Sequence, residues 1–303
     1  MVEQRWNIRH GSHTATVSER GGAISGYAVD GVPIIRGVPD GEVPSAFDGA
    51  VLAPWPNRIR DGRWTFGSVA QQLAITEPAT GNALHGLLAW VPWQVEDASD
   101  DGVTLTAVVL PQPGYPLSVA VSVTWSVSAA GLKCLLAVRN IGDEAAPFGV
   151  GTHPYFSVAG HGVDDLSLTL PAATWIDTDD RLLPVARRGV DSAAGDKDFR
   201  RSRSLHGVSL DTAFTDVTRN PDGTSAVRLA GTDGTLEIWA EEAFGWWQVY
   251  TSDYFDPGSD RYRREVAIEA MTCGPDAFNS GQDLIVLAPG AQWQGCWGVR
   301  PRS

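Results

Sequence analysis

Two histidines of this 303-residue chain lie in segments whose composition constrains the backbone. His85 lies in a turn-like stretch, residues 81–86 (GNALHG), and His153 lies in residues 149–156 (GVGTHPYF). Glycine allows close approach to the backbone, and the proline after His153 favours an extended, non-helical conformation. Histidine can give and take a proton near neutral pH. Each residue can therefore act as an acid–base group, and each can equally be a loop histidine that hydrogen-bonds to the backbone.

A glutamate in a strand-like run is the third candidate for chemistry. In residues 264–271 (REVAIEAM), alternation places Glu265, Ala267 and Glu269 on one face of the predicted strand. A glutamate in such a position usually faces solvent. The alternative is that Glu269 is held in a cleft, partly removed from water and tuned as a general base.

An arginine that follows two prolines is the fourth candidate. Arg58 lies in residues 53–62 (APWPNRIRDG), where two prolines stiffen the backbone ahead of it. A guanidinium held in this way can direct a rigid fork of donors at substrate oxygens. Taken singly, each of these four signals also fits a structural residue.

The elements that must position these residues are predicted to be strands. Alternation of apolar and small polar residues predicts strands over residues 117–127, 132–139, 166–170, 227–229 and 236–239. Asp-Gly pairs, which supply the positive φ angles of tight hairpins, occur at 30–31, 40–41, 48–49, 61–62, 101–102, 222–223 and 233–234. No stretch of a dozen residues has the apolar period of a helix. The sequence therefore predicts an all-β protein of packed antiparallel sheets.

Composition restricts the class of partner. Hydrophobic residues make up 43% of the chain and charged residues 19%, as in folded globular proteins, and we expect residues 1–303 to form one domain. The net charge of −13 disfavours nucleic acid and, more weakly, a strongly anionic substrate. The basic clusters at 200–203 and 261–264 are expected to be solvated surface, and residues 191–204 to form a long surface loop.

Cysteine and histidine spacing indicates neither a disulfide framework nor a metal site. Cys134, Cys273 and Cys296 are far apart and form no CxxC pair, and no His-x-His or His-x-x-x-His pair occurs. There is no nucleotide-binding glycine loop, so no cofactor is expected. The chain has no apolar leader and no apolar run long enough to span a membrane. We therefore expect a cytoplasmic protein, monomeric or homodimeric, with no membrane partner.

The order of these motifs resembles the aldose 1-epimerase (galactose mutarotase) family. The resemblance runs from about residue 50 to 270 and is carried, in order, by Asn57-Arg58-Ile59, Leu84-His85-Gly86, Thr152-His153-Pro154-Tyr155-Phe156, Leu210-Asp211-Thr212-Ala213-Phe214, Gln248-Val249-Tyr250-Thr251 and Ile268-Glu269. It implies a β-supersandwich of antiparallel sheets, interconversion of the α and β anomers of a hexose such as glucose or galactose, and no cofactor.

The resemblance also implies a role for each matching residue. His153 would be the general acid, Glu269 the general base and His85 an assisting hydrogen-bond donor. The residues that would bind sugar hydroxyls are Arg58 and Asp211, with Asn57 and Gln248 as further contacts. The chain departs from the common pattern at Pro56, Leu87, Ser157-Val158 and Ala270. These departures leave the catalytic set intact and put the preferred sugar in doubt.

Acid–base groups of this kind suit the opening of a sugar ring. The anomeric hydroxyl must lose a proton while the ring oxygen gains one, which requires one base and one acid within about 3 Å of different oxygens. At their ordinary pKa values the glutamate would be ionised and the histidine protonated in the active form. Indole rings pack well on a pyranose, so some of the twelve tryptophans can line the site, although core packing is commoner; the candidates are Trp55, Trp90, Trp246 and Trp247.

Three other functions remain open from the sequence. A noncatalytic carbohydrate-binding protein would share the strands and the aromatic residues but would not need His153 together with Glu269. A glycoside hydrolase needs two carboxylates flanking the bond, for which Asp211 and Glu269 are candidates, but it does not need the histidines. An epimerase of a phosphorylated or sulfonated sugar would need a cationic pocket, for which Arg58 is the obvious candidate.

Overall fold

The computed structural model describes residues 3–39, 41–44, 46–192 and 196–302. In this part of the chain the regular structure is almost entirely β-strand, with one four-residue α-helix, α1 (Ala277–Ser280), and two 3₁₀ turns at Arg60–Gly62 and Val163–Asp165. No helix among these residues is both long enough and apolar enough to cross a membrane. The prediction of an all-β protein is confirmed.

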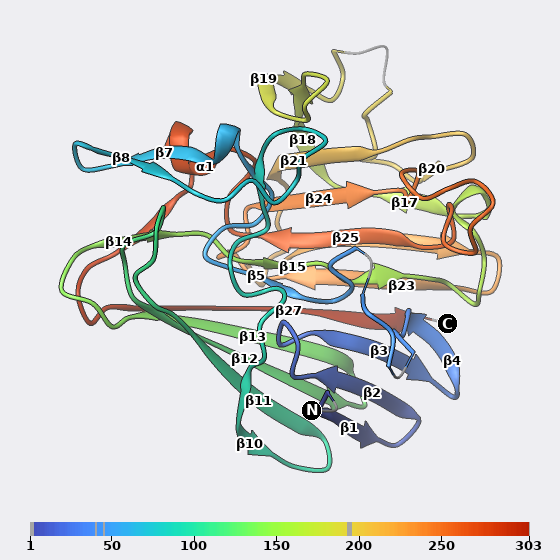
Figure 1. Cartoon of the computed structure of the whole chain (residues 1–303). Coiled ribbons are helices and arrows are strands. Elements are labelled where there is room, and N and C mark those ends of the chain that lie inside the picture. The colour runs from blue at the N-terminus through green and yellow to red at the C-terminus, as the bar shows by residue number, and fades with distance from the viewer. Residues whose placement is uncertain (1–2, 40, 45, 193–195, 303) are drawn as a thin grey trace.

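Two large sheets account for most of the described strands (Figure 1). The larger sheet has twelve described strands. Ten of them follow one another in space in the order β1 (Arg5–His10), β2 (His13–Ser18), β3 (Ile24–Val29), β4 (Val32–Ile35), β16 (Tyr155–Phe156), β25 (Val266–Met271), β24 (Trp246–Tyr250), β21 (Asp211–Val217), β18 (Ala172–Thr178) and β19 (Pro184–Gly189). The other two are β15 (Gly151–Thr152), which pairs with β25, and β5 (Val51–Leu52), which pairs with β15. Its strand pairs are antiparallel.

The second sheet has nine described strands: β10 (Gln94–Ala98), β11 (Gly102–Val109), β12 (Val119–Ser128), β13 (Gly131–Asn140), β27 (Gln292–Arg302), β23 (Gly234–Ala240), β22 (Ser225–Gly231), β17 (Ser167–Thr169) and β20 (Arg203–Ser204). Strand β27 therefore lies between β13 and β23 (Figure 1). Three short antiparallel pairs complete the described strands: β6 (Arg58–Ile59) with β9 (Ala83–Leu84), β7 (Arg63–Phe66) with β8 (Val69–Gln72), and β14 (Ala146–Phe148) with β26 (Ile285–Leu287).

The two sheets share one hydrophobic core. Val17, Val249 and Ile268 of the larger sheet belong to the same buried cluster as Val121 and Leu136 of the smaller one. Strand β2 also contacts β12 and β13. Burial of apolar surface between the sheets is the main stabilising contribution of this arrangement. The core therefore continues across both sheets, and one domain over residues 1–303 stays a prediction.

Period-two alternation predicted five of the nine described strands of the smaller sheet, and missed β10, β11, β20 and β27. In β12 the side chains from Val119 to Val127 alternate between buried and half-buried, and Trp125 is completely buried with its indole N–H donating to the Gly22 carbonyl at 2.8 Å. This strand begins two residues later than predicted. Strands β13, β17, β22 and β23 cover the other four predicted segments. The pattern is readable because each of these strands has one face against the core.

The Asp-Gly pairs have more than one use. Asp30 and Gly31 both have positive φ and form the two-residue hairpin between β3 and β4, as predicted. Asp233-Gly234 likewise falls in the hairpin from β22 to β23. The hairpin prediction is wrong for Asp48-Gly49, which precedes β5 in a loop. Asp40 lies outside the described residues.

Two surface predictions are partly wrong. In the predicted loop 191–204, Phe199 is buried and Arg203–Ser204 pair with β17, while residues 193–195 lie outside the described part of the chain. In the basic cluster 261–264, Arg261 forms a 2.7 Å ion pair with the buried Asp48. The cluster is therefore not simply solvated surface, because a buried carboxylate requires a cationic partner.

The cysteines are buried and free. Cys134, Cys273 and Cys296 form no disulfide with one another. Burial raises the pKa of the Cys273 thiol to about 12, so it is not a thiolate at neutral pH.

Candidate active site

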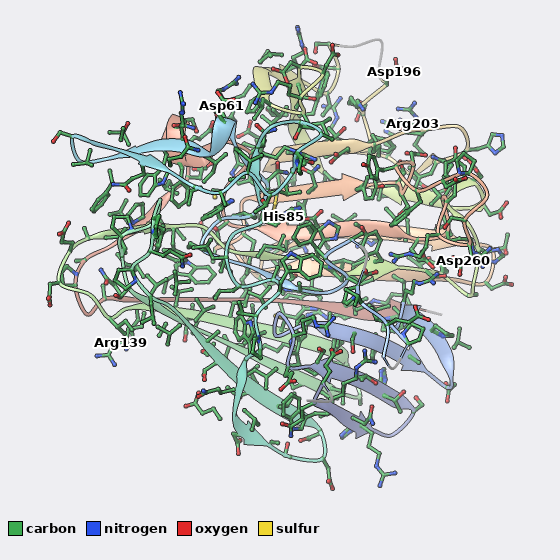
Figure 2. All side chains as sticks on the ribbon, in the orientation of Figure 1. Asp61, His85, Arg139, Asp196, Arg203 and Asp260 are labelled. Carbon is green, nitrogen blue, oxygen red and sulfur yellow. The ribbon has the colours of Figure 1, made fainter. Side chains whose placement is uncertain are left out.

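A cleft of about 360 Å³ opens over one face of the larger sheet. Its lining includes all seven residues selected from the sequence: His85, His153, Glu269, Arg58, Asp211, Asn57 and Gln248. The volume lies in the range of small-molecule sites in proteins. Figure 2 shows His85 near the middle of the molecule, well inside the charged surface residues labelled at its edge.

Strand register places the acidic side of this cleft. Gln248 on β24 lies directly opposite Glu269 on β25, and Asp211, the first residue of β21, lies opposite Tyr250 on β24. Residues directly opposite on antiparallel strands project to the same face. Three adjacent strands thus direct two carboxylates, an amide and a phenol into one space.

Two loops with unusual backbone bring in the basic side. Strand β6 pairs with β9 so that Arg58 is opposite Leu84, which places Arg58 next to His85. Asn57 and His85 both have positive φ, and the N–H of His85 donates to the Asn57 carbonyl at 2.9 Å. The N–H of His153 donates to the Ala50 carbonyl at 3.1 Å. Backbone bonds therefore hold both histidines in place.

The hydrogen bonds of His85 define its tautomer. Its Nδ1 accepts a hydrogen bond from the Asn57 backbone N–H at 3.1 Å, so the hydrogen of the neutral ring is on Nε2. Burial, with the nearby His153 and Arg58, holds the pKa of His85 well below its ordinary value. The ring is therefore neutral, and Nε2–H is a hydrogen-bond donor. This matches the donor role that the family resemblance implies.

The same bond bears on metal binding. One ligand atom each from His85, His153 and Glu269 lie within 4.8 Å of one another, which is a possible metal-ligand set. Nδ1 of His85, however, is already an acceptor for Asn57, and Nε2 carries the hydrogen. His85 could ligate a metal only by giving up that backbone hydrogen bond. The arrangement favours a donor over a ligand.

Glu269 and His153 form a buried pair. His153 Nε2 is 3.4 Å from Glu269 Oε1, and the glutamate side chain is 1% exposed. Glu269 Oε2 and His153 Nδ1 are buried without a hydrogen-bond partner among the described residues. The outward-facing alternative for this strand glutamate is thus wrong, because all six residues of β25 are buried.

Burial reverses the ordinary proton preference of this pair. Burial and repulsion from Asp211 raise the pKa of Glu269 well above its usual value, although Arg58 opposes the shift. Burial lowers the pKa of His153 to about 4, although Asp48 opposes that shift. A single proton on the pair is therefore held on the glutamate rather than the histidine. The ordinary pKa values assumed from sequence do not apply here.

A hydrogen-bonded chain of side chains borders the pair. Asn57 Nδ2 donates to Gln248 Oε1 at 3.2 Å, and Gln248 Nε2 donates to Asp211. Asp211 lies 3.5 Å from Arg58 Nη2, and Arg58 Nε and Nη2 each donate to Glu77 at 2.8 Å. In each of these contacts, from Asn57 to Glu77, a donor therefore faces an acceptor or an opposite charge.

Sequence reasoning missed several residues that line the cleft. Tyr155 and Tyr250 lie inside the motifs that carried the resemblance, so their signal was available. Glu77 and Phe47 lie in loops without a recognisable pattern. Phe47, which has positive φ, packs its ring 4.6 Å from His85 and 6.2 Å from His153 between ring centroids.

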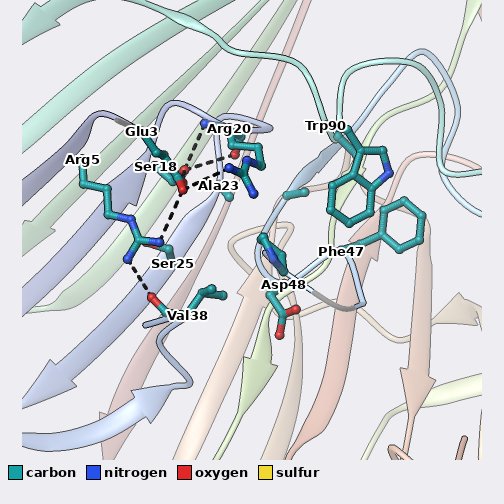
Figure 3. Close-up of a pocket in the computed structure, with 13 residues that line it drawn as sticks. Glu3, Arg5, Ser18, Arg20, Ala23, Ser25, Val38, Phe47, Asp48 and Trp90 are labelled. Atoms are coloured by element: carbon teal, nitrogen blue, oxygen red, sulfur yellow. Dashed lines mark hydrogen bonds and ion pairs between the residues drawn. The ribbon is translucent and has the colours of Figure 1, made fainter. Parts of the chain in front are cut away.

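The tryptophans suggested as cleft residues do not line it. Trp55, Trp246 and Trp247 are buried in the protein interior, and Trp90 is half exposed behind Phe47, 4.9 Å between ring centroids (Figure 3). Figure 3 also shows a second hollow beside this pair, lined by Glu3, Arg5 and Arg20 among others, with a volume of about 10 Å³. That volume accommodates about one water molecule, so it cannot hold a sugar.

The described part of the chain has a galactose mutarotase-like fold. A sequence model of the family described as aldose 1-epimerase matches residues 4–297. The chain belongs to the aldose 1-epimerase family.

The chain is also similar to an uncharacterized relative and, in fold, to solved structures. An uncharacterized protein of Escherichia coli (strain K12), YihR, is 33% identical over 288 residues, covering 95% of this chain and 90% of the relative. The fold is similar to that of a GalM/aldose epimerase homologue from C. elegans, with a TM-score of 0.87, 19% identity and coverage of 99% and 100% of the two chains. It is also similar to that of a galactose 1-epimerase from Lactobacillus acidophilus, with a TM-score of 0.83, 18% identity and coverage of 99% and 95%.

The glycine after His85 should be intolerant of a side chain. Gly86 has φ +77°, and an added Cβ would lie 2.2 Å from the Ala53 carbonyl oxygen. Gly31 has almost the same φ, +78°, with nothing within 4 Å, and is the matched control. We expect Gly31→Ala to cost about 1–2 kcal/mol of unfolding free energy, and Gly86→Ala at least about 2 kcal/mol more, because backbone must move. Urea unfolding of both variants measures this. Equal destabilisation would contradict the close approach that places His85.

Proposed function

We propose that this protein is a mutarotase that interconverts the α and β anomers of an aldohexose such as glucose or galactose. The observation that carries the proposal is the buried carboxylate–imidazole pair, 3.4 Å apart, in a cleft lined by hydrogen-bonding groups. Membership of the aldose 1-epimerase family supports it. Cytoplasmic location and the monomer or homodimer state stay predictions from the sequence.

The proposed reaction opens and recloses the sugar ring. Glu269 accepts the proton of the anomeric hydroxyl while His153 gives a proton to the ring oxygen. The bond between C1 and the ring oxygen then breaks, and C1 becomes an aldehyde. Rotation about the C1–C2 bond presents the other carbonyl face, and the two proton transfers run in reverse. No electron or group is transferred, and both residues return to their initial protonation states.

The remaining residues would hold the ring in place. His85 Nε2–H is a neutral donor suited to an oxygen that gains negative charge. Arg58 and Asp211 offer a cationic donor and an anionic acceptor for sugar hydroxyls, and Asn57 and Gln248 extend the set. Positioning of this kind contributes to catalysis by removing orientational freedom before the reaction.

The pair can react when it carries a single proton. The charge-separated form, with Glu269 ionised and His153 protonated, has the same number of protons as the form in which both are neutral. The two forms differ only by transfer of that proton across the 3.4 Å between Oε1 and Nε2. Binding a polar sugar can favour the charged form by supplying hydrogen bonds to both groups.

The rival functions explain the site less well. A binding protein gains nothing from burying an unpartnered carboxylate oxygen, which costs stability. A glycoside hydrolase has no use for the two buried histidines. Among the described cleft residues Arg58 is the sole cation, and it pairs with Glu77 and Asp211, so no observation favours a phosphorylated or sulfonated substrate.

Fresh α-D-glucose and α-D-galactose should reach anomeric equilibrium faster with the protein than in buffer alone. The physical reason is that the cleft supplies an acid and a base at fixed positions on one ring. Polarimetry follows the change directly, and exchange NMR checks it at equilibrium. Absence of acceleration with neutral, phosphorylated and sulfonated aldoses would contradict the enzyme proposal and leave the binding protein as the leading alternative.

Removing either proton-transfer group should abolish most turnover. Glu269→Gln keeps the size of the side chain without its basicity, and His153→Asn removes the titrating ring. Each change should lower kcat by at least about a hundredfold, the usual contribution of general acid–base assistance. Since Glu269→Gln also removes a buried ionisable carboxyl, unfolding by urea should find it no less stable than wild type. Near-normal kcat in Glu269→Gln would contradict the mechanism.

The rate should follow a bell in pH whose limbs are assigned in reverse of the ordinary pKa values. Below about pH 4 His153 is protonated as well as Glu269, so the pair carries two protons and kcat/KM falls on the acidic side. Above the raised pKa of Glu269 the pair loses its single proton, so kcat/KM falls on the alkaline side. A buffer-corrected pH series, with Glu269→Gln and His153→Asn residual rates for assignment, measures this. An acidic limb controlled by Glu269 would contradict the burial argument.

A further inference from the structure

Glu77 is a cleft residue that holds the side chain of Arg58. Its two carboxylate oxygens accept from Arg58 Nη2 and Nε, each at 2.8 Å, in a planar two-point ion pair. The side chains are only 10% and 18% exposed. Such a paired geometry fixes the plane of a guanidinium, which a single charge contact does not.

The loop that carries Glu77 is itself rigid. The N–H groups of Thr80, Gly81 and Asn82 all donate to the Glu77 carbonyl, which closes residues 77–82 into a tight turn. The Thr80 hydroxyl donates to the Glu77 carboxylate. Arg181, from the β18–β19 hairpin, donates its Nε–H to the Thr80 carbonyl at 2.8 Å. The carboxylate therefore has little freedom to follow Arg58 if that side chain moves.

The same loop joins Arg58 to His85. Strand β9 follows residue 82, pairs with the strand that contains Arg58, and leads directly into His85. Residues 58 and 77–84 are thus connected by two contacts, the Glu77–Arg58 ion pair and the β6–β9 strand pairing. Loss of the ion pair would leave Arg58 free to tilt toward Asp211, 3.5 Å from its Nη2.

The contacts of Arg58 leave one group for a ligand. Nε and Nη2 are taken by Glu77, whereas Nη1 has no hydrogen bond to any described residue. The charge of Arg58 also acts on the catalytic pair, since it opposes the raised pKa of Glu269 and lowers that of His153. Glu77 offsets that charge. Burial alone would raise the pKa of Glu77, but Arg58, together with Thr80 and Asn82, more than compensates, so the net shift is downward and the carboxylate is ionised.

We propose that Glu77 is a positioning residue that directs Arg58 Nη1 at a sugar hydroxyl and shields Glu269 from the Arg58 charge. The inference rests on the mutarotase function proposed above. It assigns Glu77 no proton transfer and requires that every effect of Glu77 pass through Arg58.

The first test separates binding from turnover. Glu77→Gln keeps the shape of the side chain and removes its charge and one acceptor. KM for the best aldose should rise about tenfold, as for loss of a charged hydrogen bond, and kcat should change by less than about threefold. Glu96→Gln, which removes one carboxylate from the exposed strand β10, is the matched control and should behave as wild type. A wild-type KM in Glu77→Gln would overturn the proposal.

The second test asks whether Glu77 acts through Arg58. In an Arg58→Met background, Glu77→Gln should have no further effect on kcat/KM, so the two changes are strongly non-additive. Additive losses would show that Glu77 acts independently and would contradict the inference.

The third test uses pH, which a purely structural role would not affect. With its charge less compensated, Arg58 should lower the pKa of Glu269, so the alkaline limb of kcat/KM should move to lower pH by roughly half a unit in Glu77→Gln. Glu77→Asp, which keeps the charge but shortens the reach, should raise KM without that movement. If Glu77→Gln does not fold, Glu77→Asp still tests the effect on KM. An unmoved limb in Glu77→Gln, or an equal movement in Glu77→Asp, would contradict the shielding role.

These outcomes are distinguishable from failure of the proposed function. A wild-type protein that accelerates mutarotation of no aldose contradicts the function itself. A wild-type protein that is active, with Glu77→Gln indistinguishable from it in KM and pH profile, contradicts only the role of Glu77.

Discussion

The site depends on keeping a carboxylate and an imidazole together in a place that water hardly reaches. Glu269 and His153 are 3.4 Å apart, and each has a buried polar atom without a partner among the described residues. Charges are costly in such surroundings, so burial favours the neutral form of both groups. In the proposed reaction this pair gives and accepts a proton on the same ligand. This cost in stability is the usual accompaniment of acid–base function.

The rest of the fold keeps this pair and its neighbours in fixed positions. Strands β21, β24 and β25 are rigid neighbours with one hydrogen-bonding pattern, so Asp211, Gln248 and Glu269 cannot move independently. The second sheet packs behind them and completes the core. Catalytic groups on paired strands are held more precisely than groups on loops, because each backbone bond restrains its neighbours.

The loops place Arg58 and the two histidines opposite the acidic residues Asp211 and Glu269 of the sheet. Positive φ at Asn57 and His85 allows two backbone segments to exchange hydrogen bonds, and one of these bonds determines the His85 tautomer. Arg58 balances two carboxylates, Glu77 and Asp211, on a protein with a net charge of −13. Charge balance inside the cleft is therefore local and is independent of the net charge.

The sequence by itself determined the all-β class, most strands of the smaller sheet and the family. Alternation is visible along one segment wherever a strand has one buried face, as in β12, and motif order survives without knowledge of contacts. The candidate residues from Asn57 to Glu269 could be selected for the same reason, and the structure brings all seven into one cleft. Their roles stay proposals.

Only the tertiary structure decided how these residues meet. Strand β25 is buried on both faces, so alternation could not tell whether Glu269 faces solvent or a cleft. Glu77, Phe47 and the buried pair of Arg261 with Asp48 lie in irregular segments, where no periodicity marks a contact. The lowered pKa of His153 and the raised pKa of Glu269 depend on what covers them. Sequence records neighbours along the chain, whereas burial and charge pairing depend on neighbours in space.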